Sequence, residues 1–365
     1  MNKVSHLLIG LFITIATIGT ANAQFTETRE FQKRFAVNPG TSIEITNKYG
    51  TIELITWEKD SVVIDVRMKI EEKKVSRLDK TLDNIDFDFT SSTHYLIART
   101  IVDKNRSQLE NEFLKFKETL MQAESSIQID YKVWLPASNP LKIENKFGDI
   151  FIDDYDGPAE INLSNGKLKA HNFNKKATIN LNFADASISE LVSGRLTTNY
   201  SDLYIKNAGS LHISSKSSEI EIIESKELNI DSRRDKYRLR MTDKIEVEGS
   251  FTSIRLSQLI DRGTLRVNYG DLEIEKIDPG FSNIYLESKN TNIDLSFNPE
   301  SHFNFELTET KADLKMGREI TIEDKVLINE KDNTNKIQGF FGKKSEEDQK
   351  LYINAISGDL SIFSY

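Results

Sequence analysis

Cysteine is absent from this sequence of 365 residues. Without cysteine the chain has no disulfide framework, no thiolate nucleophile and no cysteine-ligated metal. Its fold must therefore be held together by backbone hydrogen bonds and apolar packing alone.

Histidine is also scarce, which limits the chemistry open to the chain. Beyond the N-terminal His6, the histidines are His94, His171, His212 and His302. None of them has the spacing of a metal site or a catalytic triad. Paired carboxylates such as Asp153–Asp154 occur, but any acidic surface offers such pairs by chance. We predict no catalytic residue, no bound metal and no cofactor, and hence a protein that is not an enzyme.

A surplus of basic residues is missing as well. The chain has 48 Lys and Arg against 57 Asp and Glu, a formal net charge of -9 at pH 7. Proteins that bind nucleic acids generally carry the opposite balance. The composition therefore argues against a nucleic-acid partner.

Long apolar runs are confined to the first residues. Residues 1–23 combine Lys3, an apolar centre from Leu7 to Ile18 and the small residues Ala21–Ala23, which is the pattern of a secretory signal peptide. No cysteine follows this segment, so a lipid anchor there is excluded, and no later segment reaches the ~20 apolar residues of a membrane-spanning helix. We expect export, with a mature chain that begins near Gln24 and lies in the periplasm or at the cell surface, associated with the outer membrane.

What the sequence does contain is one short phrase repeated many times. The clearest copies are Ile143–Ile152 and Leu265–Ile274, in which apolar residues alternate up to Phe147 or Tyr269, skip one position and resume. We call this central residue the pivot. The pattern is typical of a strand, a tight turn and a second strand. The pivots of the main array are Phe147, Asn165, Phe183, Tyr200, Ser217, Arg234, Phe251, Tyr269 and Asn290.

The regular spacing of the pivots predicts the architecture. Successive pivots lie 17 or 18 residues apart, with a last gap of 21. One copy cannot bury its own apolar face, so each copy needs neighbours stacked on both sides. We predict a mainly β, single-chain β-solenoid of the parallel β-helix or β-roll type, with about 17–18 residues per rung. Ile150, Leu203, Ile254 and Leu272 should then stack inside it.

The segments outside the main array predict caps. An early copy has its pivot at Tyr49, and a further one has its pivot at Glu309. Helical spacing of apolar residues predicts a short helix in 71–82 and an amphipathic helix in 107–124, which we interpret as an N-terminal excursion that caps the solenoid. The expected units are a signal peptide (1–23), an N-terminal β-rich region with two helices (24–135), the main solenoid (136–316), and irregular C-terminal repeats with a cap (317–365).

The columns around the pivots contain two patterns that bear on binding. The position two places after the pivot is often Asp, but Lys167, Lys236 and Lys311 interrupt it, so turn stabilisation is favoured over a calcium ladder. Aromatic pivots offer a stacking track for sugar rings, as in a carbohydrate-binding protein. Their parity matches that of the inward Ile and Leu residues before them, however, so we expect most of them to point into the core.

A cluster of basic residues is the second candidate binding site in the sequence. It comprises Arg233, Arg234, Lys236, Arg238, Arg240 and Arg255. Stacked opposite charges usually form a solvated ladder of little energetic value. The alternative is a patch that binds an anionic glycan or a lipid headgroup.

Four segments carry a resemblance to a known family: Asn47–Gly50, Asn145–Asp149, Asn268–Asp271 and Tyr131–Pro136. In these the chain resembles the putative adhesin family of exported bacterial β-strand repeat proteins, whose function is unassigned. The resemblance implies an exported β-repeat protein and transfers no catalytic residue. We therefore expect a non-catalytic adhesin-like or envelope scaffold whose partner is a cell-surface glycan or an envelope protein. The alternatives are a carbohydrate- or anionic-lipid-binding module and a carbohydrate-active β-helix enzyme.

Overall fold

The computed structural model describes residues 24–102, 126–345 and 349–365. Within these ranges the chain is mainly β, as predicted, with one helix, α1 (Val75–Asp83). The strands are β1 (Phe25–Ala36), β2 (Ser42–Lys48), β3 (Ile52–Trp57), β4 (Ser61–Glu72), β5 (Ile85–Ser91), β6 (Tyr95–Val102), β7 (Ser126–Pro136), β8 (Leu141–Lys146), β9 (Ile150–Ile152), β10 (Ala159–Ser164), β11 (Lys167–Asn182), β12 (Asp185–Asn199), β13 (Asp202–Lys216), β14 (Glu219–Arg233), β15 (Lys236–Ser250), β16 (Ser253–Asn268), β17 (Asp271–Ile277), β18 (Asn283–Lys289), β19 (Asn292–Phe297), β20 (Phe303–Met316), β21 (Ile320–Asn329), β22 (Thr334–Phe341) and β23 (Lys350–Ser364).

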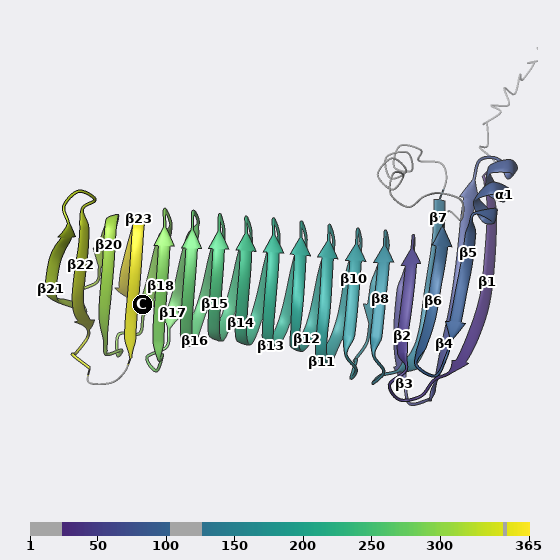
Figure 1. Ribbon diagram of the computed structural model, residues 1–365, viewed down its shortest axis with the longest axis horizontal. Coiled ribbons are helices and arrows are strands. Elements are labelled where there is room, and N and C mark those ends of the chain that lie inside the picture. Colours follow the sequence, from purple (N-terminus) through teal and green to yellow (C-terminus); the bar gives the residue numbers. More distant parts are fainter. Residues whose placement is uncertain (1–23, 103–125, 346–348) are drawn as a thin grey trace, which may run out of the picture.

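Consecutive copies of the phrase pair in parallel and in register. Leu203 in β13 lies opposite Ile220 in β14, and Ile213 lies opposite Ile230 in the same pair of strands. The long strands β11 to β16 thus pair through both of their halves, the half after one pivot and the half before the next. Figure 1 shows the result as a long row of strands standing side by side. Each copy obtains its hydrogen-bond partners from its two neighbours.

The buried apolar residues form continuous columns along the row of strands. Ile150, Leu203, Ile254 and Leu272, which were predicted to stack inside, are all buried in one column. In order along the row, that column is Ile52, Ile150, Leu168, Ala186, Leu203, Ile220, Tyr237, Ile254, Leu272, Ile293 and Leu360. Burial raises the pKa of the Tyr237 phenol, whose oxygen lies 2.7 Å from Ser215 Oγ.

The N-terminal end of the row is closed by an insertion. Strands β2 and β3 pair directly with β8 and β9. The segment from β4 to β7 is therefore an insertion in the sequence between two copies that are neighbours in space. In that segment β4 pairs antiparallel with β1 and β7, and β5 pairs with β6. Helix α1 packs on β4 and β1 with Leu78 buried. It begins later than the predicted 71–82, because β4 continues to Glu72; the helix predicted in 107–124 lies outside the described residues.

The C-terminal end departs from chain order. The last copy, β23, lies between β18 and β19 on one side and β20 on the other. The prediction of a pivot at Glu309 is wrong, since the positive φ is at Lys311. Antiparallel pairing with β22 keeps β20 extended through Thr310 and delays the turn. Strand β22 in turn pairs with β21, which ends the row (Figure 1).

The turns place a small or polar residue inward, directly after each pivot. At Gly148 the reason is close backbone approach, since a Cβ would lie 1.9 Å from the carbonyl oxygen of Gly50. Asp235 occupies the same position in its own turn and is buried. Its carboxyl group accepts hydrogen bonds from Ser215 Oγ (2.6 Å), Ser232 Oγ (2.6 Å), Ser218 N (2.8 Å) and Arg233 N (2.8 Å).

We predict that Asp235→Ala destabilises the central rungs by about 3 kcal/mol, because it removes the acceptor for four hydrogen-bond donors, three of them on buried residues. The measurement is the urea midpoint of unfolding followed by circular dichroism. Asp185→Ala is the matched control, since Asp185 is exposed and makes no side-chain hydrogen bond or ion pair with the described residues. Equal midpoints for the two variants would show that the Asp235 network contributes nothing.

Candidate binding face

The pivots of neighbouring copies follow one another along one edge of the row of strands, and their backbone conformation sets the shape of that edge. All ten predicted pivots from Tyr49 to Asn290 have positive φ, between 50° and 69°. The expectation that the aromatic pivots point into the core is wrong, because Phe183 is 62% exposed and Phe251 is 55% exposed. The residue after each pivot points inward instead, as the buried Ala184 and Thr252 show. The turn therefore leaves two consecutive residues facing outward, and simple alternation fails there.

The aromatic pivots stack in pairs along this edge. Ring centroids are 5.6 Å apart for Tyr49 and Phe147, 5.0 Å apart for Phe183 and Tyr200, and 5.1 Å apart for Phe251 and Tyr269. The interplanar angles are 18°, 3° and 11°. Parallel ring stacking at this distance is a favourable contact. The sequence contains a signal that the rings are exposed. The inward residues on either side of each pivot are three positions apart, whereas strict alternation would separate them by an even number.

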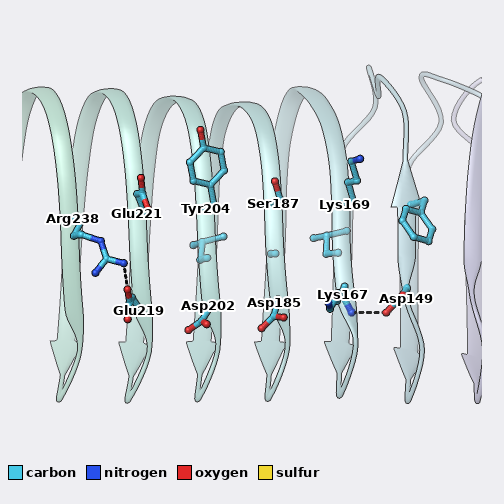
Figure 2. Close-up of a pocket in the computed structure, with 14 residues that line it drawn as sticks. Asp149, Lys167, Lys169, Asp185, Ser187, Asp202, Tyr204, Glu219, Glu221 and Arg238 are labelled. Atoms are coloured by element: carbon cyan, nitrogen blue, oxygen red, sulfur yellow. Dashed lines mark hydrogen bonds and ion pairs between the residues drawn. The ribbon is translucent and has the colours of Figure 1, made fainter.

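A shallow hollow lies beside this edge. It is on the post-turn face, which we define as the outward side chains two and four positions after the pivots. The hollow has a volume of about 550 Å³. Figure 2 shows its two rows of labelled side chains, which cross neighbouring rungs. The row nearer the pivots is Asp149, Lys167, Asp185, Asp202 and Glu219, and the second row includes Lys169, Ser187, Tyr204, Glu221 and Arg238.

The carboxylates of the first row differ in their partners. Asp149 Oδ1 accepts a hydrogen bond from the backbone N–H of Lys167 at 2.8 Å, which fits the predicted role in turn stabilisation. Glu219 forms an ion pair with Arg238 (Figure 2). Asp185 and Asp202 are in-register neighbours and make no side-chain hydrogen bond or ion pair with the described residues. Like charges directly opposite each other on neighbouring strands repel.

The predicted basic cluster is spread over three parts of the edge. Arg233 ends β14 before the turn, Arg234 is itself a pivot, and the others lie on the post-turn side. Arg238 is paired with Glu219, and Arg255 is paired with Glu273 at 2.7 Å and with Glu275 at 3.4 Å. Arg233, Arg234, Lys236 and Arg240 form no ion pair with the described residues.

The histidines take part in ordinary surface contacts. His171 Nδ1 lies 2.6 Å from Asp154 Oδ1, and His212 Nδ1 lies 2.9 Å from Asn229 Oδ1. In residues 24–102, 126–345 and 349–365 there is no group of three or more His, Asp or Glu residues that could hold a metal ion. Across the same ranges no helix has the length and apolarity needed to cross a membrane.

Comparison with known proteins yields little. No protein-family model matches the chain, and no curated protein sequence matches it. A solved structure of a putative cell adhesion protein from Clostridium sporogenes aligns with 92% of this chain and 100% of its own, at 7% identity and a TM-score of 0.16. A likeness this weak carries no argument about fold or function.

We predict that Asp202→Asn raises the melting temperature slightly, because it relieves repulsion with Asp185 and Glu219 on the neighbouring rungs. The gain should shrink at about 1 M salt, where the Debye length falls to roughly 3 Å. Asp271→Asn is the matched control, because Asp271 lies between the uncharged Ser253 and Asn292. A lower melting temperature for Asp202→Asn at both salt concentrations would contradict the repulsion.

Proposed function

We propose that the protein is an exported, non-catalytic β-solenoid that acts as an adhesin-like or envelope scaffold. The observation that carries the proposal is the in-register parallel pairing of consecutive copies from β8 to β19, continued by β23. Such an array is stabilised by nearest-neighbour contacts, so its outward residues are free to serve recognition.

The geometry supports a scaffold in a second way. The row of strands presents long faces on which outward side chains recur at the spacing of neighbouring strands, roughly 4.8 Å. A repetitive partner, such as a polysaccharide or a second ordered protein, can engage many equivalent positions at once, and weak contacts then add up to stable attachment. The signal-peptide pattern of residues 1–23 supports export to the envelope, where such partners are found.

A carbohydrate-binding module is the second candidate function. The observation that favours it is the set of exposed, stacked aromatic pivots beside the polar hollow of the post-turn face. Aromatic rings with adjacent polar groups suit sugars, which combine apolar C–H faces with hydroxyls. An anionic lipid surface has less support, because Arg238 and Arg255 are neutralised by glutamates.

Location is the first test of the scaffold proposal. Fractionation of the producing cell should place a chain that begins near Gln24 in the periplasmic or outer-membrane fraction, because the signal peptide directs export and is removed. Protease treatment of intact cells then separates the two locations, since only a surface protein is cleaved. An unprocessed chain in the cytosol would sink the proposal.

A glycan array tests the carbohydrate candidate. The mature chain should bind a restricted set of saccharides, because ring faces and fixed polar groups select for sugar shape and charge. Chemical analysis of the bound saccharides should find them intact. Uniform lack of binding would leave the scaffold without a glycan partner, and release of reducing ends or unsaturated products would instead indicate an enzyme.

A further inference from the structure

One stretch of the edge combines exposed rings with unpaired cations. It is the run of four consecutive pivots Tyr200, Ser217, Arg234 and Phe251. Their backbones follow one another in a hydrogen-bonded ladder, with Tyr200 N bonded to the Lys216 carbonyl and Ser217 N bonded to the Arg233 carbonyl, both at 3.0 Å. The four side chains therefore leave the edge one rung apart.

Ser217 leaves a gap in this run. Tyr200 stacks on Phe183 on its other side and is 50% exposed. The Arg234 guanidinium carbon lies 6.0 Å from the centroid of the Phe251 ring, at the outer limit of a cation–π contact. A phenol ring and a guanidinium plane thus flank a small serine, whose hydroxyl makes no hydrogen bond with the described residues.

The gap matches the thickness of one sugar ring. Tyr200 and Arg234 are two rungs apart, which is roughly 9.5 Å at 4.7–4.9 Å per rung. Two carbon–carbon contacts of roughly 3.5–4.0 Å, one on each face of a ring, add up to about 8 Å. The remaining space accommodates the pucker of a pyranose and excludes a second ring.

The charge around the gap is positive, although the whole chain is acidic. Lys216 and Arg233 are in-register neighbours at the ends of β13 and β14, and Arg234 and Lys236 follow in the turn and at the start of β15. All four are without an ion pair to the described residues. Of the carboxyl groups in these turns, Asp235 is buried in its hydrogen-bond network and Glu219 is paired with Arg238, whereas Asp202, two residues after Tyr200, has no side-chain partner among the described residues.

Polar groups continue from the gap onto the adjoining surface. Arg233 also lines a hollow of about 480 Å³ together with Ser214, Ser250 and Asn268. The same hollow contains the carboxylate of Asp231 and the ion pair between Arg266 and Glu248. Hydroxyl and amide groups at this position can donate to and accept from the hydroxyls of a neighbouring sugar unit. The site therefore extends beyond one ring.

From these contacts we infer that the Ser217 gap binds an acidic polysaccharide, with one uronate sugar between Tyr200 and Arg234. The apolar face of the sugar packs on the Tyr200 ring, and its carboxylate is bound by Arg234 and Arg233. Arginine suits this role because its planar fork matches a carboxylate. The inference rests on the carbohydrate-binding candidate proposed above and names its ligand class and subsite. A membrane of anionic lipid would use the cations and leave the ring of Tyr200 without a role.

The test is isothermal titration of the mature chain with hexagalacturonate. Arg234→Ala and Tyr200→Ala should each weaken binding at least tenfold, and raising the salt concentration should weaken binding to the parent chain, because a charge pair at an exposed site is screened. Arg255→Ala and Tyr352→Ala are the matched controls, since Arg255 is neutralised by glutamates and Tyr352 is an exposed tyrosine of β23 that is not a pivot. Both controls should bind as the parent does.

A gap-filling variant separates binding from stability. Ser217→Phe places a ring at a pivot geometry that Phe183 and Phe251 already adopt, so the variant should fold with an unchanged or higher melting temperature. It should lose binding of hexagalacturonate, because its ring occupies the gap. Retained binding in folded Ser217→Phe would overturn the inference.

Two further ligands decide the ligand class. Cellohexaose, which is neutral, should bind at least tenfold more weakly than hexagalacturonate; equal binding that Arg234→Ala does not change would overturn the acidic-sugar inference. Binding to phosphatidylglycerol vesicles without binding to hexagalacturonate would replace it with a lipid surface. Envelope location together with failure of all three ligands would refute this site and leave the scaffold proposal intact.

Discussion

The structure depends on the parallel register between copies of one phrase. Each copy has unpaired backbone groups on both sides and an apolar face that it cannot cover alone. Stacking the next copy directly on top solves both problems, but only if the pivots coincide, because a slip of one residue would turn every inward side chain outward. The ladder from Phe147 N to the Ser164 carbonyl, and from Asn165 N to the Asn182 carbonyl, is how that coincidence is held.

Register also converts sequence variation into surface pattern. Because equivalent positions fall in columns, one substitution in one copy changes one point on a regular lattice. Exposed ion pairs such as Arg255–Glu273 contribute little to stability, so the outward columns can vary while the inward columns stay apolar. At Asp235 a carboxyl group points inward, and it is tolerated only with its four donors in place.

Local patterns in the sequence were enough to predict the period, the pivots and the inward columns. Alternation around Phe147 and Tyr269 reports directly on which residues are buried, and the inward column holds from Ile52 to Leu360. Pairing between strands that are distant in the sequence could not be predicted from these local patterns. The insertion of β23 before β20, and the shift of the expected pivot from Glu309 to Lys311, follow from strand pairing between distant segments. The outward position of the aromatic rings was mispredicted because the alternation of inward and outward side chains was assumed to continue through the turn, where it is interrupted. The basic cluster was predicted as one patch because most of its residues are close in sequence. The turn at Arg234 instead places them on different parts of the edge.

The aromatic pivots are the feature that turn geometry does not explain. A residue with a side chain in the left-handed region costs roughly 1–2 kcal/mol, and Asn, which tolerates that region, holds the same turn at positions 165 and 290. Stacking adds about 0.5–1.5 kcal/mol per pair of rings beyond the apolar area that the rings bury, and half or more of the Phe183 and Tyr200 side chains remains in water. The exposed faces of the rings therefore contribute nothing to folding. In the proposal made above, a polysaccharide on this edge covers those exposed faces.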